Sequence, residues 1–191
     1  MRPRSLVAAC AAASVLLSCS DRSQSADPTA PDLESEVHAA AAAPGGGTRP
    51  VLMMDACDAE SFNTAIGPGT CARPHGLLFD KFIRLLGEHH SVGAWRFAPA
   101  TINAKVGQTL LAVNRGGEVH TFTEVQAFGG GIVPELNALA GTPVPAPECL
   151  ALQGGDFVPP GGSYTEEVDQ PGTRLYECCL HPWMRAAVTT R

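Results

Sequence analysis

One short segment near the C-terminal end limits the possible folds more than any other part of the chain. Cys178, His181 and Met184 follow one another at a spacing of three residues. A further histidine, His120, lies far upstream in the sequence. These four side chains can serve a single centre only if the fold brings residue 120 against the 178–184 loop. The pattern therefore predicts a fold that joins two distant segments.

The chemistry of these four side chains indicates one metal above others. Two histidines, one cysteine and a methionine are the ligands of a type 1 (blue) copper site, with a trigonal plane and a long, weak axial thioether. Zinc prefers cysteine, histidine and carboxylate ligands, so a methionine would have no role in a zinc site. We therefore expect one type 1 copper ion, bound by His120, Cys178, His181 and the axial Met184.

The N-terminal part of the chain has the composition of a targeting segment. A basic start and a short apolar stretch predict a lipoprotein-type signal peptide over residues 1–18, with lipidation of Cys19 after cleavage. An ordinary secretory signal that is cut further along is the alternative. Residues 19–50 are rich in Ala, Ser, Pro and Gly, and they predict a disordered tether. We expect an exported protein of the periplasm or cell envelope, anchored to a membrane through lipid only.

The charge balance argues against one class of partner. The formal net charge is −6, and loss of Arg2 and Arg4 with the signal peptide changes it to −8. Nucleic-acid binding needs a basic face, so no nucleic-acid partner is expected. An acidic surface suits a soluble monomer that meets basic protein partners.

The cysteine count gives an independent argument for a metal-bound thiolate. Of seven cysteines, Cys10 and Cys19 belong to the leader region, which leaves five for the folded part. In an exported protein an odd number leaves one thiol outside the disulfides. Four of the five fit two bridges, and the odd one fits the metal.

Two disulfides are expected from the remaining cysteines. Cys57 and Cys71 flank a Gly-Pro-Gly turn and predict a local bridge. Adjacent residues on a strand point to opposite faces, so Cys178 can bind metal while Cys179 bonds to Cys149. The alternative bridge, from Cys149 to Cys178, stays open from the sequence.

Short alternating segments separated by turn residues predict an all-β sandwich. Strands are expected near residues 95–99, 101–106, 108–114, 118–125, 164–168, 174–179 and 185–190, with a helical turn near 134–140. Apolar residues at helical spacing over 77–87 predict one amphipathic helix. We expect a disulfide-stapled, helix-containing N-terminal extension over 51–90, followed by the sandwich domain over 91–191.

Residues 92–190 resemble the cupredoxin family, and its plastocyanin and amicyanin branch in particular. The resemblance rests on three segments: 97–108, 113–121 with His120, and the loop Cys178-Cys179-Leu180-His181-Pro182-Trp183-Met184. It implies a Greek-key β-sandwich with copper at one end, held by His120, Cys178, His181 and Met184. Two features depart from the family pattern, namely the second cysteine beside the ligand and Arg185-Ala186 after the methionine.

The resemblance implies a one-electron carrier rather than an enzyme. Within the family the electron passes through the loop histidine, which implies His181, with Trp183 in the partner contact. A protein redox partner is expected, although its identity is open. Two alternatives remain: a copper storage or delivery protein, and a cupredoxin-fold interaction module that has lost copper and holds Cys178 in a disulfide.

Overall fold

The computed structural model describes residues 46–191. The predicted signal peptide (1–18), the lipidation of Cys19 and most of the predicted tether (19–50) lie outside the described residues. Within the described part of the chain, none of the helices is long and apolar enough to cross a membrane.

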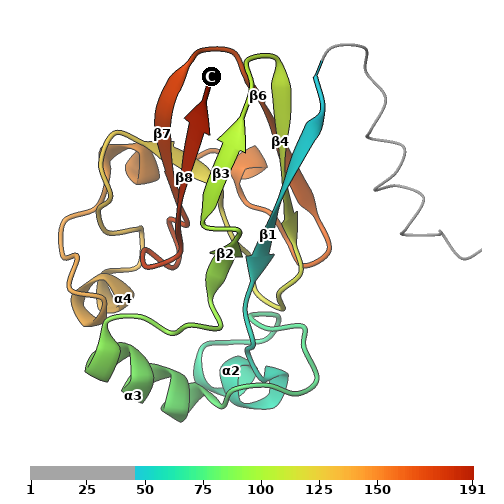
Figure 1. The fold of residues 1–191 in the computed structure, drawn as a ribbon. Helices are drawn as coiled ribbons and strands as arrows, with labels where there is room; N and C mark the ends of the chain where they lie inside the picture. The colour runs from blue at the N-terminus through green and yellow to red at the C-terminus, as the bar shows by residue number, and fades with distance from the viewer. Residues whose placement is uncertain (1–45) are drawn as a thin grey trace, which may run out of the picture.

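Two four-stranded sheets form the body of the described chain (Figure 1). The strands are β1 (Thr48–Met54), β2 (Arg96–Ala98), β3 (Thr101–Ala104), β4 (Gln108–Asn114), β5 (Thr123–Val125), β6 (Ser163–Val168), β7 (Gly172–Glu177) and β8 (Arg185–Thr190). The first sheet has the order β2-β1-β4-β6 and the second has the order β3-β8-β7-β5. The chain changes sheets repeatedly between β3 and β7, and the predicted all-β sandwich is confirmed.

One apolar core lies between the sheets because each strand turns alternate side chains inward. On β4 the buried positions are Leu110, Ala112 and Asn114, which are two residues apart. Across the core, the ring of Phe97 on β2 lies 5.1 Å from that of Phe122, which in turn stacks on Tyr176 of β7 with centroids 4.3 Å apart. This alternation is the pattern from which the strands were predicted.

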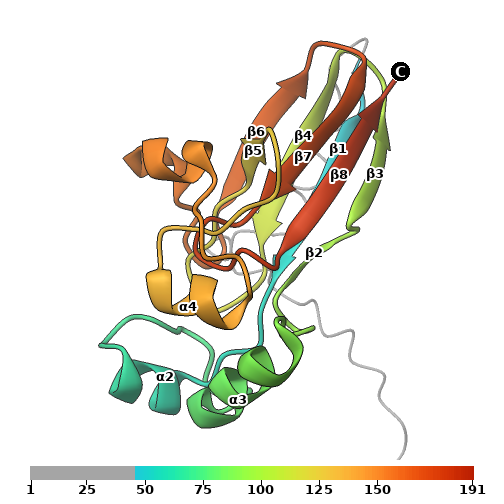
Figure 2. The same cartoon turned by 90° about the vertical axis from the view of Figure 1, so that its left-hand side faces the viewer.

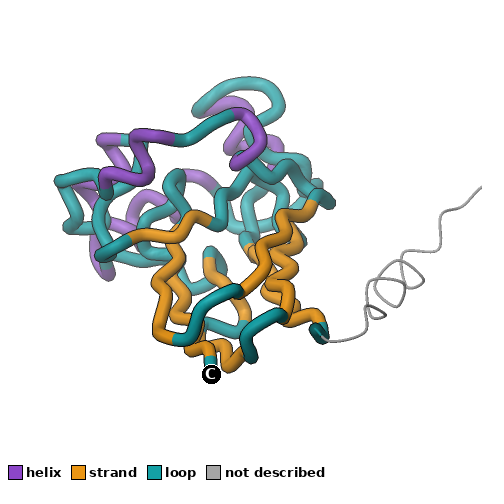
Figure 3. The backbone as a smooth tube through the Cα atoms, turned by 90° about the horizontal axis from the view of Figure 1, so that it is seen from above, coloured by secondary structure: helices purple, strands orange, loops and turns teal. Residues whose placement is uncertain are grey.

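The helices gather at one end of the sandwich, away from the C-terminus (Figures 1 and 2). Figure 3, which looks at the molecule from above, shows the helices (purple) lying to one side of the strands (orange). The helices are α2 (Ala59–Ala65), α3 (Phe79–His89) and α4 (Pro134–Leu139), and two 3-10 turns follow as η1 (Pro147–Ala151) and η2 (Gly154–Asp156).

The predicted amphipathic helix corresponds to α3, whose Phe82 and Leu86 are buried against the core. The helix continues two residues beyond the expected stop at Gly87, and His90 ends it in the left-handed conformation with φ 56°. The sequence analysis missed α2, which the Asp58 side chain caps by accepting a hydrogen bond from the Ser61 N–H.

The expected boundary between tether and extension differs from the structure. Residues 48–50, assigned to the disordered tether, begin β1. Residues 51–54, assigned to the extension, continue β1, which pairs with β4 in parallel and with β2 antiparallel. This strand is therefore an interior strand of the first sheet. Its partners lie more than forty residues away, so local sequence could not reveal the pairing.

The strand expected over residues 118–125 is also shorter than predicted. Only Thr123–Val125 forms β5, and His120 makes an isolated bridge with Val158. Residues 116–118 instead turn around Asp55, whose carboxylate accepts the N–H groups of Gly117 and Glu118. The backbone of Gly117 and Glu118 thus bonds to a side chain rather than to a neighbouring strand, and β5 begins only after His120.

Candidate metal centre

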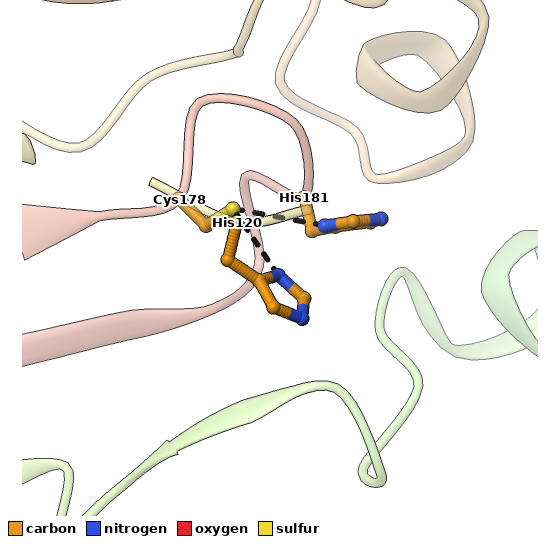
Figure 4. A group of neighbouring side chains, drawn as sticks. All are labelled: His120, Cys178 and His181. Carbon is orange, nitrogen blue, oxygen red and sulfur yellow. Dashed lines mark hydrogen bonds between the residues drawn. The ribbon is translucent and has the colours of Figure 1, made fainter. Parts of the chain in front are cut away.

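Three side chains from two distant segments converge at the end of the sandwich where the helices lie. The Cys178 Sγ lies 3.7 Å from the Nδ1 of His120 and 3.6 Å from the Nδ1 of His181. Figure 4 shows both imidazole rings directed at the sulfur. All three side chains are buried, and their donor atoms lie close enough together to hold one metal ion.

The loop after β7 holds Cys178, His181 and Met184 in place through its own hydrogen bonds. The His181 N–H donates to the Cys178 carbonyl, and the Met184 N–H donates to the His181 carbonyl. The Cys178 N–H in turn donates to the Met184 carbonyl, which closes the loop. Cys178 and Met184 are fully buried as a result, so the loop carries its thioether into the interior.

His120 is oriented by a buried carboxylate. Its Nε2 lies 2.9 Å from Asp55 Oδ2, which leaves Nδ1 toward the sulfur. Burial alone would lower the pKa of His120, but the hydrogen bond with Asp55 and the contact with Cys178 raise that pKa to about 9. The pKa of Asp55 is lowered despite its burial, because His120 and backbone N–H groups donate to its carboxylate.

His181 has a similar arrangement on its outer nitrogen. Its Nε2 lies 3.6 Å from the Glu118 Oε2, and the same oxygen accepts a 2.6 Å hydrogen bond from the Trp95 indole N–H. Burial raises the pKa of Glu118. Each histidine therefore faces the sulfur with one nitrogen and a carboxylate with the other, an arrangement that fixes ring orientation in metal sites.

The environment of Cys178 favours the thiolate, the form of cysteine that binds metals. Burial would raise the pKa of the Cys178 thiol, but its contacts with His120 and His181 outweigh burial and hold that pKa well below its usual range. The Thr121 N–H also donates to the sulfur at 3.4 Å. A hydrogen bond to a ligand sulfur is one of the protein's means of tuning a metal centre.

The adjacent cysteines divide into one free thiol and one disulfide partner. Cys178 is free and buried, whereas Cys179 is bonded to Cys149, with Cα atoms 5.3 Å apart. Cys57 is bonded to Cys71. Cys57 also lies near the carboxylates of Asp55 and Glu118, but its sulfur is already in a disulfide and that group offers no thiolate.

The spacing of the donor atoms fits a metal ion. Bonds of about 2.0 Å to nitrogen and about 2.3 Å to sulfur, set at trigonal angles, place those two atoms about 3.7 Å apart. The two observed sulfur-to-nitrogen distances are 3.7 and 3.6 Å. The two sulfur-to-nitrogen distances therefore match those of a trigonal site built from His120, Cys178 and His181.

Trp183, predicted as a partner contact, lies partly buried against the core. Its ring stands 5.5 Å from His181 and 5.9 Å from Phe82 of α3. The helical end of the molecule therefore covers the loop, and His181 itself is only 5% exposed. A cavity of about 250 Å³ reaches the ring between Ile66, Leu136 and Leu180.

The sequence analysis missed Asp55 and Glu118 as parts of this site. Asp55 follows β1 directly, and Glu118 stands two residues before His120. An acidic residue beside a candidate ligand was the only available signal for Glu118. Asp55 lies 65 residues from His120, and only the pairing of β1 with β4 brings the two together.

No family model matches the chain, and no curated protein matches it. Among solved structures, it is similar to a purple cupredoxin from Nitrosopumilus maritimus at 14% identity, covering 74% of this chain and 98% of that one, with a TM-score of 0.42. A Cu(I) amicyanin mutant shares 23% identity over 50% and 73% of the two chains, with a TM-score of 0.35.

The oxidised plastocyanin from Dryopteris crassirhizoma shares 19% identity over 53% of this chain and 93% of that one, with a TM-score of 0.36. These neighbours are all cupredoxins. The cupredoxin likeness concerns the arrangement of strands, whereas the metal chemistry rests on the side chains described above.

Proposed function

We propose that this protein is a type 1 (blue) copper protein that carries single electrons in the bacterial cell envelope and is not an enzyme. The observation that carries the proposal is the free, buried Cys178 sulfur with two imidazole Nδ1 atoms at 3.6–3.7 Å. Met184, buried in the same loop, is the proposed axial ligand.

The donor set supports copper over other metals. A thiolate and a thioether are soft ligands, and together with two imidazoles they select copper. When bound, one copper ion supplies a reversible one-electron couple. The chain holds His120 against Asp55 and His181 near Glu118, and it excludes water from Cys178 by burial. These contacts resist rearrangement of the ligands, which favours rapid electron exchange.

The free thiol also bears on the two alternative functions. An interaction module that has lost copper would hold Cys178 in a disulfide, whereas Cys149 is bonded to Cys179 and leaves Cys178 free. A storage or delivery protein needs ligands that exchange easily. The burial of all three converging ligands favours retention instead.

The proposal extends to the location of the protein. Disulfides persist in oxidising compartments, and the two disulfides of the described chain fit export to the periplasm or cell envelope. Lipid attachment at Cys19, a monomeric state and a protein redox partner are parts of the same proposal.

The test is the visible absorption spectrum of the full chain after Cu(II) addition. We expect an intense blue band from charge transfer between thiolate and copper, lost in Cys178→Ser. The matched control is the double variant Cys149→Ser/Cys179→Ser, which removes the neighbouring sulfurs and should keep the band. A parent protein with a free thiol and no band would refute the electron carrier. Tight copper binding without a reversible couple would favour storage or delivery.

A further inference from the structure

An unbroken set of aromatic rings connects the metal centre with the helical extension. The Trp183 ring lies 5.5 Å from His181 and 5.9 Å from Phe82, and Phe82 lies 6.2 Å from Phe79. The Phe62 ring packs beside these rings, with its centroid 5.2 Å from that of Phe79. At these centroid distances neighbouring rings are in van der Waals contact.

A second connection from His181 reaches the same ring. The His181 Nε2 faces Glu118 at 3.6 Å, and Glu118 accepts a hydrogen bond from the Trp95 indole. The Trp95 ring then packs 4.7 Å from Phe82. Both connections therefore meet at Phe82, which is a residue of α3 and not of the sandwich.

The aromatic set ends at a surface groove between α2 and α3, the two helices that lie beside each other in Figure 2. The groove has a volume of about 600 Å³, and Phe79 and Leu78 line it. Leu78 is 53% exposed, so its apolar side chain is accessible to a partner. The groove thus has an apolar lining that includes Phe79, the last ring of the aromatic set.

The rim of this groove is acidic. Asp58, Glu60 and Asp80 line it, and no lysine, arginine or histidine does so among the described residues. Complementary charge steers association and favours partners of opposite sign. The groove is therefore matched to a partner that carries lysine or arginine side chains around an apolar contact.

A partner protein has less access to His181 than to the groove. His181 is only 5% exposed, and its neighbours include Ile66 at the end of α2, Leu136 of α4 and Leu180 of the loop. Electron tunnelling becomes much slower across unfilled space than through packed atoms. The rings between His181 and Phe79 give a path through packed protein atoms from the centre to the groove.

We propose that the α2–α3 groove is the docking site for a basic, protein-bound redox group, and that Phe82 and Phe79 couple this site to the metal centre. The inference rests on the proposed function, since the route has a purpose only if the centre exchanges electrons. In each transfer one electron leaves the reduced partner, which is oxidised, and reduces the metal centre. No bond forms or breaks, and no proton moves.

The docking test uses cytochrome c, a lysine-rich haem protein, as the probe. Calorimetry at low ionic strength would compare the full chain with Glu60→Gln/Asp80→Asn, which neutralises two rim charges and retains the Asp58 cap of α2. We expect about 3- to 10-fold weaker binding in the variant and weaker binding of the parent as salt is added. Glu167→Gln, on exposed β6, is the matched control and should bind as the parent does.

The coupling test measures electron exchange with the bound probe in Phe82→Leu and Phe79→Leu. We expect both variants to exchange electrons with the saturating probe more slowly than the parent does. Phe82 does not line the groove, so Phe82→Leu should bind cytochrome c as tightly as the parent. Exchange with hexacyanoferrate, a small anion that the groove does not favour, should be unchanged. Phe79→Leu, at a partly buried ring, keeps the test valid if Phe82→Leu folds poorly.

The outcomes separate this inference from the proposed function. Unchanged probe affinity in Glu60→Gln/Asp80→Asn, or loss of affinity in Leu136→Ser beside His181 instead, overturns the groove as the docking site. Unchanged electron exchange in both phenylalanine variants overturns the route. Either result leaves the proposed function intact if the parent develops its blue band and reacts with hexacyanoferrate. A parent without the band refutes the function itself, and probe binding to the metal-free chain still reports on the groove.

Discussion

Asp55 and His120 form a fully buried pair, with Oδ2 and Nε2 2.9 Å apart and 65 residues of chain between them. The carboxylate also accepts N–H groups from Cys57, Gly117 and Glu118. One side chain therefore links the end of β1, the turn before His120 and the His120 ring itself. The first prediction follows from this pair.

Asp55→Asn replaces a charged acceptor with an amide whose NH₂ group faces N–H donors. Because breaking a buried ion pair leaves one partner unpaired, we expect a loss of about 3 kcal/mol in the free energy of unfolding of the metal-free protein. Copper affinity should fall about 10- to 100-fold, since the ring orientation of His120 is no longer fixed. Urea unfolding and a competition titration measure the two effects.

The matched control for this change is Asp80→Asn, which makes the same chemical substitution at an exposed position. It should alter stability by less than about 0.5 kcal/mol. Equal effects of the two substitutions would show that the Asp55 pair does not stabilise the fold.

The second prediction concerns the disulfide beside the free thiol. Cys149→Ser/Cys179→Ser removes a bridge between residues 30 positions apart, which should cost roughly 3–4 kcal/mol of unfolding free energy. Thermal unfolding measures the loss. A thiol count on the unfolded, metal-free mature protein, without Cys10 and with Cys19 lipidated, should give one in both the parent and the double variant, and two in Cys179→Ser, where Cys149 is released. No thiol in the parent would contradict the assigned pairing.

The third prediction concerns Gly131, which packs against the backbone of the ligand loop. A Cβ at this position would lie 1.9 Å from the Cys179 carbonyl oxygen, so backbone must move in Gly131→Ala. We expect a loss of about 1–3 kcal/mol and a shifted copper absorption band, because Cys178 is adjacent. Gly154→Ala, where a Cβ meets open space, should leave both quantities unchanged. Similar behaviour of the two variants would argue against this close approach.

The fourth prediction concerns pH and lies away from the metal. Burial raises the pKa of Glu166, which accepts from the Tyr176 hydroxyl and lies 3.5 Å from Arg174, with Glu124 and Asp169 nearby. The folded state therefore holds this proton more tightly than the unfolded state, in which the pKa is about 4.5. Stability from this group is present below pH 4.5 and is lost as pH rises through the raised pKa.

Urea unfolding of the parent and Glu166→Gln between pH 4 and pH 8 tests this sign. We expect the stability of the parent relative to the variant to fall as pH increases over the lower part of that range, then to level off. A difference that stays constant, or that grows with pH, contradicts the direction of the pKa shift.

The sequence predicted those elements that depend on local pattern. Alternation located β4 and β8 closely, and helical spacing located α3, because buried and less buried positions repeat within each element. The candidate ligands Cys178, His181 and Met184 could be proposed from the sequence for a similar reason, since they lie within seven residues.

Other parts depend on contacts between distant residues. The place of β1 inside the first sheet and the positions of Asp55 and Glu118 follow from pairings that no local pattern reports. The helical end of the molecule also covers His181, and this too depends on contacts between residues that are distant in the sequence. The family resemblance implied that the electron passes through the edge of His181, whereas the packing of α3 on Trp183 helps to leave that ring only 5% exposed.

The interior position of β1 affects how the protein unfolds. Its end supplies Asp55, and its neighbours in the sheet are β2 and β4. The helical extension and the metal site are therefore parts of one cooperative unit. A fragment that starts at residue 91 would lack an inner strand together with the carboxylate that orients His120. Loss of the metal and loss of helicity should accordingly occur in a single transition.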